Sequence, residues 1–466
     1  MIHVHTFLPL VQTYICSDSI HSELQEIADN PSTTYEKQAR IAREAPEFLH
    51  RNKTGTWADF VAAGLSTLNA QGGHHLRLFQ KLNQNMRNEK AARYATHQEK
   101  RDLVRHLELG KIAPEIYPLL AKHPYGSPLQ CEAVKEALGL EVIYRERRYN
   151  THVPMYRRLV ELQDHIGDPR HDILVTGESF LRIPARISAV VISPPTEGFP
   201  YGCVELVVKR DFANDMVYGR KLLKWVQDAI LEACDNRRDV RPSHAGKMVQ
   251  VGLNMGPRHR RILGYAKSFT ANLDDEERRN QDEKVIGCFG LFWHGVVSFI
   301  PGDITAPVRK CLEDEYPQLG TRDIPSGPGF TVVLDGKHYV FSQSQRGPPE
   351  GILTAGYAAH THRDPAYCRW AFGFTAVHDR SEDSELPEGH GSNYVDMTLG
   401  IVVESGDGTL TAFQPDYLHG TTYAGKIVNY GLSATMTRRV RDGFEEFIKE
   451  GKPVVFAFQS VDEHKN

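Results

Sequence analysis

The stretch ILTAGYAAHTHRD, residues 352–364, decides the fold and the chemistry expected of this chain. It begins with β-branched and small residues, as strands do, and ends in His362-Arg363-Asp364. In a helix, positions i and i+2 point about 200° apart, whereas in a strand they project from the same face. His362 and Asp364 at a strand end can therefore reach one metal ion. His-x-Asp occurs nowhere else among the 22 histidines.

A second histidine ligand must come from a distant strand. His419 is the best candidate because it lies between the strand-like segments GTLTAFQP (408–415) and IVNYGLSATMT (427–437). Two histidines and one carboxylate on one face leave three coordination positions open, as in non-haem Fe(II) oxygenases. The alternative is that the histidines are hydrogen-bonded core residues and Asp364 caps a turn.

Length and composition exclude several classes of protein. The 466 residues are 40% hydrophobic and 24% charged, which is a globular composition rather than a disordered or collagen-like one. No apolar run approaches the roughly 20 residues of a membrane span, and the amino terminus reads as no signal peptide. Seven scattered cysteines without a Cys-x-x-Cys pair argue against a thiolate zinc site and fit a reducing compartment. With a net charge of −4, any nucleic-acid surface must be a local basic patch.

The expected fold class is α+β, in three parts. Residues 1–170 read as mostly helical, residues 171–244 as a mixed α/β extension, and residues 245–466 as a β-rich core of short strands separated by turn signals. A helix is expected at DMVYGRKLLKWVQDAILEACDN (215–236). The run VIGCFGLFWHGVVSFI (285–300) is expected to be a strand, and LDDEERRNQD (273–282) a solvated loop.

The strings HTHRDPAY (360–367), YLHGTT (417–422) and YGLSATM (430–436) resemble the TET/J-binding-protein family, most closely its fungal members, which lack a cysteine-rich domain. These are Fe(II)- and 2-oxoglutarate-dependent dioxygenases that oxidise methylated bases in DNA. The resemblance covers Gly246 to Gln459. It implies a double-stranded β-helix (jelly-roll) core, an iron triad of His362, Asp364 and His419, 2-oxoglutarate and O2 as co-substrates, methylated double-stranded DNA as substrate, and a nuclear location. No membrane or protein partner is expected.

One position departs from the family pattern. In the family, an arginine usually lies two residues before a serine on the strand after the distal histidine, and it binds the distal carboxylate of 2-oxoglutarate. Here Ser433 matches the serine, but Gly431 occupies the arginine position. If Ser433 faces the pocket, Asn429 and Arg439 share its face of the strand. We therefore expect Arg439 as the replacement anchor, with Arg438 and then Arg369 as alternatives. A solvated basic strand end explains the same arginines equally well.

Contacts with DNA are expected from local patches. Basic residues interleaved with tyrosines include Arg147 and Arg148, and a second patch is Arg258, Arg260 and Arg261. A target base must be flipped into the pocket, where Tyr367 matches a family position that lines the base site. Asp335 reads first as part of an Asp-Gly hairpin turn, and alternatively as an acceptor for the exocyclic amine of the base. Gly329, in the preceding loop, would allow close approach of the substrate.

The function that this resemblance implies is oxidation of the methyl group of 5-methylcytosine in duplex DNA to hydroxymethyl, and further to formyl and carboxyl forms, with base flipping. Two alternatives remain open. One is the same chemistry on another substrate, as in an AlkB-like demethylase of N6-methyladenine or a hydroxylase of proteins or small molecules. The other is a non-catalytic DNA-binding or cupin-like scaffold, for which Gly431 is the best evidence.

Overall fold

The structure is a computed structural model. It describes residues 13–14, 17–30, 35–45, 56–68, 74–147, 180–213, 218–242, 244–256, 263–266, 269–314, 316–359, 361–380, 391–422, 424 and 427–449. The chain divides into two compact units, Met1–Arg101 and Asp102–Asn466. The three-part division at residues 170 and 244 stays a prediction. None of the helices in these ranges is long and apolar enough to cross a bilayer.

The first unit is helical. Its helices are α2 (Asp18–Asp29), α3 (Tyr35–Glu44), α4 (Trp57–Leu68) and the first part of α5 (His74–His106). They bury a separate core that includes Leu24, Ile41, Phe60 and Phe79. Because the unit has its own apolar core, each helix places one face toward the interior, as the sequence predicted for this region.

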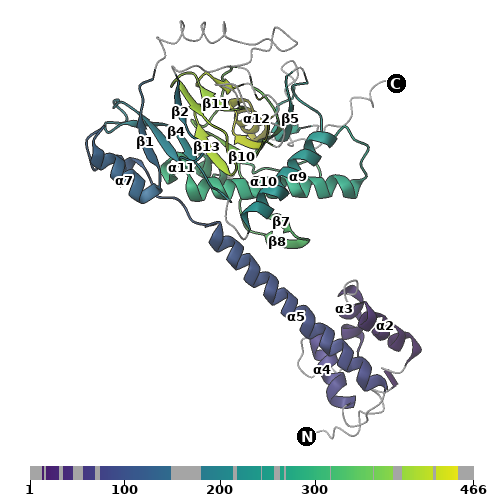
Figure 1. Cartoon of the computed structure of the whole chain (residues 1–466). Coiled ribbons are helices and arrows are strands. Elements are labelled where there is room, and N and C mark those ends of the chain that lie inside the picture. Colours follow the sequence, from purple (N-terminus) through teal and green to yellow (C-terminus); the bar gives the residue numbers. More distant parts are fainter. Residues whose placement is uncertain are drawn as a thin grey trace, which may run out of the picture. The chain divides into compact units, whose positions relative to one another are not determined.

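The second unit contains the sheets, coloured from teal to yellow in Figure 1. The largest sheet has nine strands in the order β1-β3-β4-β13-β10-β15-β9-β5-β6, a second has the order β14-β11-β12-β2, and β7 pairs with β8. The bounds are β1 (Glu141–Tyr144), β2 (Leu181–Ile183), β3 (Ala189–Ser193), β4 (Cys203–Lys209), β5 (Lys247–Asn254), β6 (Gly264–Tyr265), β7 (Phe330–Leu334), β8 (Lys337–Phe341), β9 (Glu350–Ala355), β10 (Ala371–Asp379), β11 (Tyr394–Asp396), β12 (Ile401–Val403), β13 (Thr409–Phe413), β14 (His419–Thr421) and β15 (Val428–Thr435).

The two larger sheets share a core. Buried side chains of β3 and β4, such as Val191 and Leu206, pack with Ile183 of β2 and with Ile401 and Val403 of β12. Burial along β15 alternates, as expected for a strand with one face toward the core and the other toward a pocket. The α+β class is therefore confirmed.

Helices cover the other face of the nine-stranded sheet. Those packed directly on it are α9 (Gly219–Asn236) and α10 (Asp275–Phe299), and the same core includes residues of α6 (Tyr117–Leu120), α7 (Pro128–Leu138) and α11 (Gly302–Glu313). Helix α12 (Arg438–Lys449) packs elsewhere, with Val440 against Leu253 of β5 and Tyr265 of β6. In Figure 1, α9 and α10 lie beside each other against this sheet, and both contact β15. The helix expected at 215–236 is confirmed by α9.

The strand expected at 285–300 and the loop expected at 273–282 are wrong, because both belong to α10. Asp274 and Glu277 form a reciprocal capping box that starts the helix. The second half of α10 is buried between the large sheet and the β7–β8 hairpin, so apolar residues occur on all of its sides and the helical periodicity disappears. Gly287 and Gly290 let the hairpin approach closely: an added Cβ would lie 2.2 Å from the Thr331 carbonyl oxygen or 2.4 Å from the Phe330 ring.

Candidate metal centre

Two histidines and one aspartate converge at one end of the second unit. His362, Asp364 and His419 each offer a ligand atom, and these atoms lie within 4.8 Å of one another. Asp364 Oδ2 is 3.4 Å from His362 Nε2 and 3.9 Å from His419 Nε2. The residues that the sequence predicted as metal ligands are thus brought together, although their binding of iron stays a prediction.

Main-chain hydrogen bonds hold the three residues in place. His362 and His419 form an isolated antiparallel bridge, in which each amide donates to the other's carbonyl at 2.9 and 3.0 Å. The Asp364 amide donates to the Pro415 carbonyl at 2.8 Å. His362 lies beyond the end of β9, so it pairs through this single bridge rather than within a strand. The chain around His419 therefore aligns the whole His-x-Asp segment.

The protonation of the site suits metal binding. His419 is buried, and its Nδ1 lies 2.8 Å from the Tyr417 carbonyl oxygen, which fixes Nδ1 as the donor and leaves Nε2 as a free lone pair. Burial, and then the neighbouring His362, lower the pKa of His419 to about 4, so the ring is neutral at neutral pH. Burial opposes ionisation of Asp364, but His362, His419 and Arg241 together lower its pKa.

A buried carboxylate supports the loop that carries His419. Glu205 of β4 is fully buried and accepts hydrogen bonds from Tyr417 Oη at 2.6 Å and Gln414 Nε2 at 2.5 Å. Ser193 also donates to it, and Arg147 forms an ion pair with it at 2.5 Å. This network was not predicted from the sequence. The available signal was a single acidic residue within the apolar strand CVELVVK.

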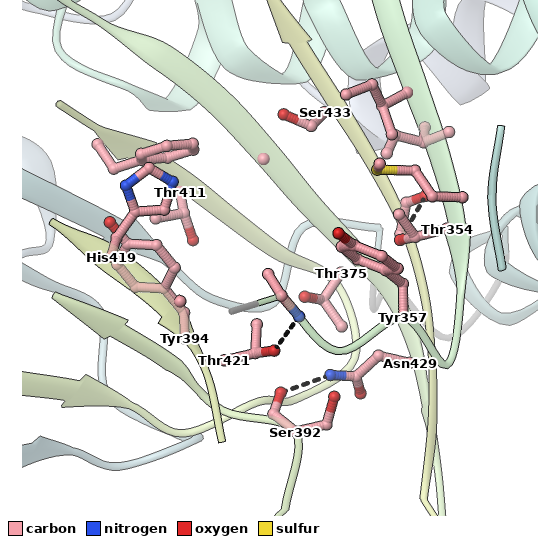
Figure 2. Close-up of a pocket in the computed structure, with 18 of the residues that line it drawn as sticks. Thr354, Tyr357, Thr375, Ser392, Tyr394, Thr411, His419, Thr421, Asn429 and Ser433 are labelled. Atoms are coloured by element: carbon pink, nitrogen blue, oxygen red, sulfur yellow. Dashed lines mark hydrogen bonds between the residues drawn. The ribbon is translucent and has the colours of Figure 1, made fainter. Parts of the chain in front are cut away.

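The triad borders a pocket of about 530 Å³. Its walls carry hydroxyl groups from β9, β10, β13 and β15, including Thr354, Thr375, Thr411 and Ser433, as Figure 2 shows. Tyr394 lies beside His419, with ring centroids 5.9 Å apart. Its hydroxyl is buried and has no hydrogen-bond partner among the described residues.

One wall of the pocket carries a group that the sequence analysis missed. Arg241, His244 and Tyr357 all line the cavity. The rings of His244 and Tyr357 are nearly parallel, with centroids 5.6 Å apart, and His244 Nδ1 lies 2.8 Å from the Tyr357 hydroxyl. Arg241 and Arg363 are the arginines that line the pocket within the described ranges. Arg241 and His244 precede β5 and Tyr357 follows β9, so no local sequence pattern joins the three residues.

Of the residues expected to bind 2-oxoglutarate, Ser433 and Asn429 line the pocket. Asn429 is fully engaged: its amide nitrogen donates to the Ser392 carbonyl at 2.7 Å, and its oxygen lies 2.5 Å from His378 Nδ1. Asn429 therefore holds the wall together.

The strand expected to carry Arg438 and Arg439 is wrong, because β15 ends at Thr435 and α12 begins at Arg438. Arg439 donates to the Gly256 carbonyl, and Arg438 to the Ala366 carbonyl. Arg369 precedes β10, and its guanidinium contacts Cys203 and lies over the Phe199 ring. The structure brings none of these three arginines into the pocket lining.

The residues expected to contact the base do not line this pocket. Asp335 lies in the turn between β7 and β8, where it pairs with Lys221, and it does not line the pocket; the hairpin-turn interpretation is the one that agrees with the structure. Gly329 precedes the same hairpin. Tyr367 is 39% exposed and lies under the Arg441 guanidinium, outside the pocket lining.

Of the basic residues expected to bind DNA, Arg147 is committed to Glu205 and so is not a free phosphate ligand. The remaining four lie outside the described residues: Arg148, Arg258, Arg260 and Arg261. Their contribution stays a prediction.

Comparison with known proteins gives little further evidence. No protein-family model matches the sequence, and no curated protein matches it. Among solved structures, the chain is similar to NgTET1 in complex with 5mC DNA, with 10% identity and a TM-score of 0.35 over 60% of this chain and 90% of that chain. A similarity of this extent does not by itself assign a fold or an activity.

Proposed function

We propose that the protein is an Fe(II)- and 2-oxoglutarate-dependent dioxygenase with a double-stranded β-helix core that oxidises the methyl group of 5-methylcytosine in double-stranded DNA. The observation that carries the proposal is the convergence of His362, Asp364 and His419 at the edge of a large pocket. Action on genomic DNA would place the protein in the nucleus.

The donor set fits ferrous iron. Two neutral imidazoles and one carboxylate form a three-ligand face, and the hydrogen bond from His419 Nδ1 to the Tyr417 carbonyl directs Nε2 toward the metal. Asp364 is 55% exposed on its side chain, so the ligand face opens toward the pocket rather than into the core. Iron bound there, with O2 and 2-oxoglutarate, supplies the oxidation: decarboxylation gives succinate and CO2, and one oxygen atom enters the methyl group.

Arg241 is the cation that we assign to the co-substrate carboxylate. Gly431 leaves β15 without the usual arginine, and an added Cβ there would already lie 3.1 Å from Thr354 Oγ1. Arg241 lines the same cavity and is close enough to Asp364 to lower its pKa. Its guanidinium can bind a carboxylate through two parallel hydrogen bonds, and the threonine hydroxyls of the pocket add further donors.

The rest of the pocket suits a flipped base. A methyl group inside a duplex cannot reach the triad, so the nucleotide must leave the helix. Phe413 and the His244–Tyr357 pair give the pocket flat faces for stacking. Arg363 is exposed and also lines the pocket, and we assign it to a backbone phosphate. The imidazole of His244 and the hydroxyl of Tyr357, which both line the pocket, are the hydrogen-bonding groups that we assign to the base edge.

A second candidate function is a non-catalytic DNA-binding scaffold, which is favoured by the single observation that Gly431 removes the usual carboxylate anchor. The experiment that separates the two is incubation of the purified chain, Fe(II) and 2-oxoglutarate with duplexes that carry either one 5-methylcytosine or one N6-methyladenine. Mass spectrometry of the digested nucleosides and of succinate reads out the reaction.

We expect hydroxymethylcytosine and succinate from the wild type and neither from Asp364→Ala. His338→Ala, an exposed histidine on β8, is the matched control and should retain activity. Plain adenine and formaldehyde without oxidised cytosine would instead identify an N-methyl demethylase. Binding of DNA without any succinate would identify the scaffold.

A further inference from the structure

A second group of metal-ligating side chains lies in the helical first unit. His21 is on α2, and His74 and His75 are the first two residues of α5. One nitrogen of each ring lies within 4.8 Å of one nitrogen of each of the others. We propose that these three histidines form a second divalent-metal site, with zinc as the best-fitting ion, that ties α2 to the start of α5.

The packing of the two helices creates this cluster. α2 and α5 run parallel: Asn85 donates to the Ala28 carbonyl at 3.0 Å, and Lys81 pairs with Asp29 at the far end of α2. Their apolar faces share the core of the unit. This alignment brings His21, at the beginning of α2, against the beginning of α5.

The three rings lie close to one another. The ring centroid of His21 lies 5.0 Å from that of His75 and 5.5 Å from that of His74, and the rings of His74 and His75 are perpendicular. Zinc–nitrogen bonds of about 2.0–2.1 Å require the nitrogens to approach somewhat closer than they do here. Side-chain rotation can provide this movement, because His74 is exposed and His21 and His75 are only half-buried.

A polar atom in the cluster lacks the partner that a metal would give it. Nδ1 of His21 is buried and has no hydrogen bond to any described residue. A buried ring nitrogen without a partner lowers stability, and a metal ion satisfies its lone pair. Glu23, the nearest acidic residue along α2, is engaged by Arg40 and so does not fill this role.

The donor type selects the metal. Three neutral imidazoles suit zinc, which leaves a fourth tetrahedral position for water, whereas magnesium and calcium prefer oxygen ligands. The site requires nothing from the proposed oxygenase reaction and lies in a different unit of the chain.

The test uses the full chain without an affinity tag, in an Asp364→Ala background that removes one ligand of the other candidate centre. The chain is equilibrated with Zn²⁺ and desalted, its zinc content is measured by mass spectrometry, and its affinity by competition with a chromophoric chelator. We expect about one zinc per chain. Loss of a residue that only supports a metal ligand weakens metal binding by roughly 10- to 100-fold. His21→Gln and His75→Gln each remove a ligand itself and should weaken zinc binding by at least as much. His97→Gln, an exposed histidine on the same α5, should bind as the background does.

Absence of zinc from the background chain, or equal affinity in folded His21→Gln and His75→Gln variants, would overturn the proposal. Circular dichroism verifies that the variants are folded. If the variants are not folded, the test is instead the visible spectrum of the background chain after Co²⁺ is added. Tetrahedral ligation by nitrogen gives Co²⁺ strong visible absorption. A spectrum of weak octahedral bands would then contradict the site.

Discussion

The amides of His362 and His419 each donate to the other's carbonyl, at 2.9 and 3.0 Å, although a long stretch of chain separates the two residues. This reciprocal pair places their rings 4.3 Å apart, centroid to centroid. Because main-chain atoms make the pair, the geometry of the candidate metal centre does not depend on the ligand side chains themselves.

The first prediction is that Asp364→Ala and His362→Ala abolish turnover while the free energy of unfolding changes little. Both side chains are substantially exposed, 55% and 39%, and surface substitutions of this kind change stability by about 0.5 kcal/mol. Product formation and a urea titration measure the two effects. Wild-type turnover by Asp364→Ala would remove the residue from the metal centre.

The second prediction concerns the buried support of His419. Glu205→Ala leaves Arg147 without its charge partner and removes the acceptor of Tyr417, so it should lower the free energy of unfolding by about 3–5 kcal/mol. Tyr417→Phe removes one hydrogen bond of this network and should lower the free energy of unfolding by only about 1 kcal/mol. It should nevertheless weaken iron binding by roughly 10-fold or more, because the segment that carries His419 loses its bond to Glu205.

Urea unfolding and an iron titration compare these variants with Glu404→Gln, which alters a more exposed ion pair on β2–β12 and should change neither quantity appreciably. Unchanged iron affinity in Tyr417→Phe would show that the Glu205 network is structural only.

The third prediction is a pH dependence due to Glu350. Burial raises the pKa of Glu350 from 4.5 to about 7, while Thr437 donates two hydrogen bonds to it. Between these two pKa values the folded chain holds a proton that the unfolded chain has released, so stability falls as pH rises through this window. The full change is on the order of 3 kcal/mol.

Glu350→Gln cannot ionise at this position. From pH 5 to pH 8 the free energy of unfolding of the wild type should therefore fall relative to that of the variant. The comparison at pH 5, where Glu350 and its glutamine replacement are both neutral in the folded chain, is the internal control. A difference that is constant with pH would contradict the buried, protonated carboxyl.

The fourth prediction distinguishes two arginines. Arg241→Ala should raise the 2-oxoglutarate requirement by roughly 10- to 100-fold, because hydrogen bonds to a charged group contribute about 1.5–3 kcal/mol. Arg439→Ala should leave the requirement unchanged. Arg439 lies on α12, donates to the Gly256 carbonyl and is outside the pocket lining. Steady-state measurements at varied 2-oxoglutarate test both, and the opposite ranking would restore Arg439 as the anchor.

The fifth prediction is that Asp335→Phe does not change the ratio of cytosine to adenine oxidation. Asp335 pairs with Lys221 in a hairpin turn remote from the pocket lining. It has a left-handed backbone, φ 51°, so phenylalanine there should cost about 1 kcal/mol or more of stability. A selective loss of cytosine oxidation would show that the hairpin reaches the base.

The sequence by itself determined the parts that depend on short-range pattern. The i and i+2 spacing of His362 and Asp364 identified two of the candidate ligands, because side chains at that spacing share a face only in extended chain. The strand context of His419 identified the third. Helix α9 followed from its periodic apolar residues, and most strands from their β-branched runs and turns.

Only the tertiary structure decided the features that depend on what surrounds a segment. The apolar run of α10 looks like a strand because it is buried on every side, which removes the periodicity that marks a helix. Strand parity could not place Arg439, since β15 stops before it and α12 turns the chain away. Glu205, Arg241 and the cluster of His21, His74 and His75 join residues distant in sequence, and side chains brought together by packing leave no spacing to read.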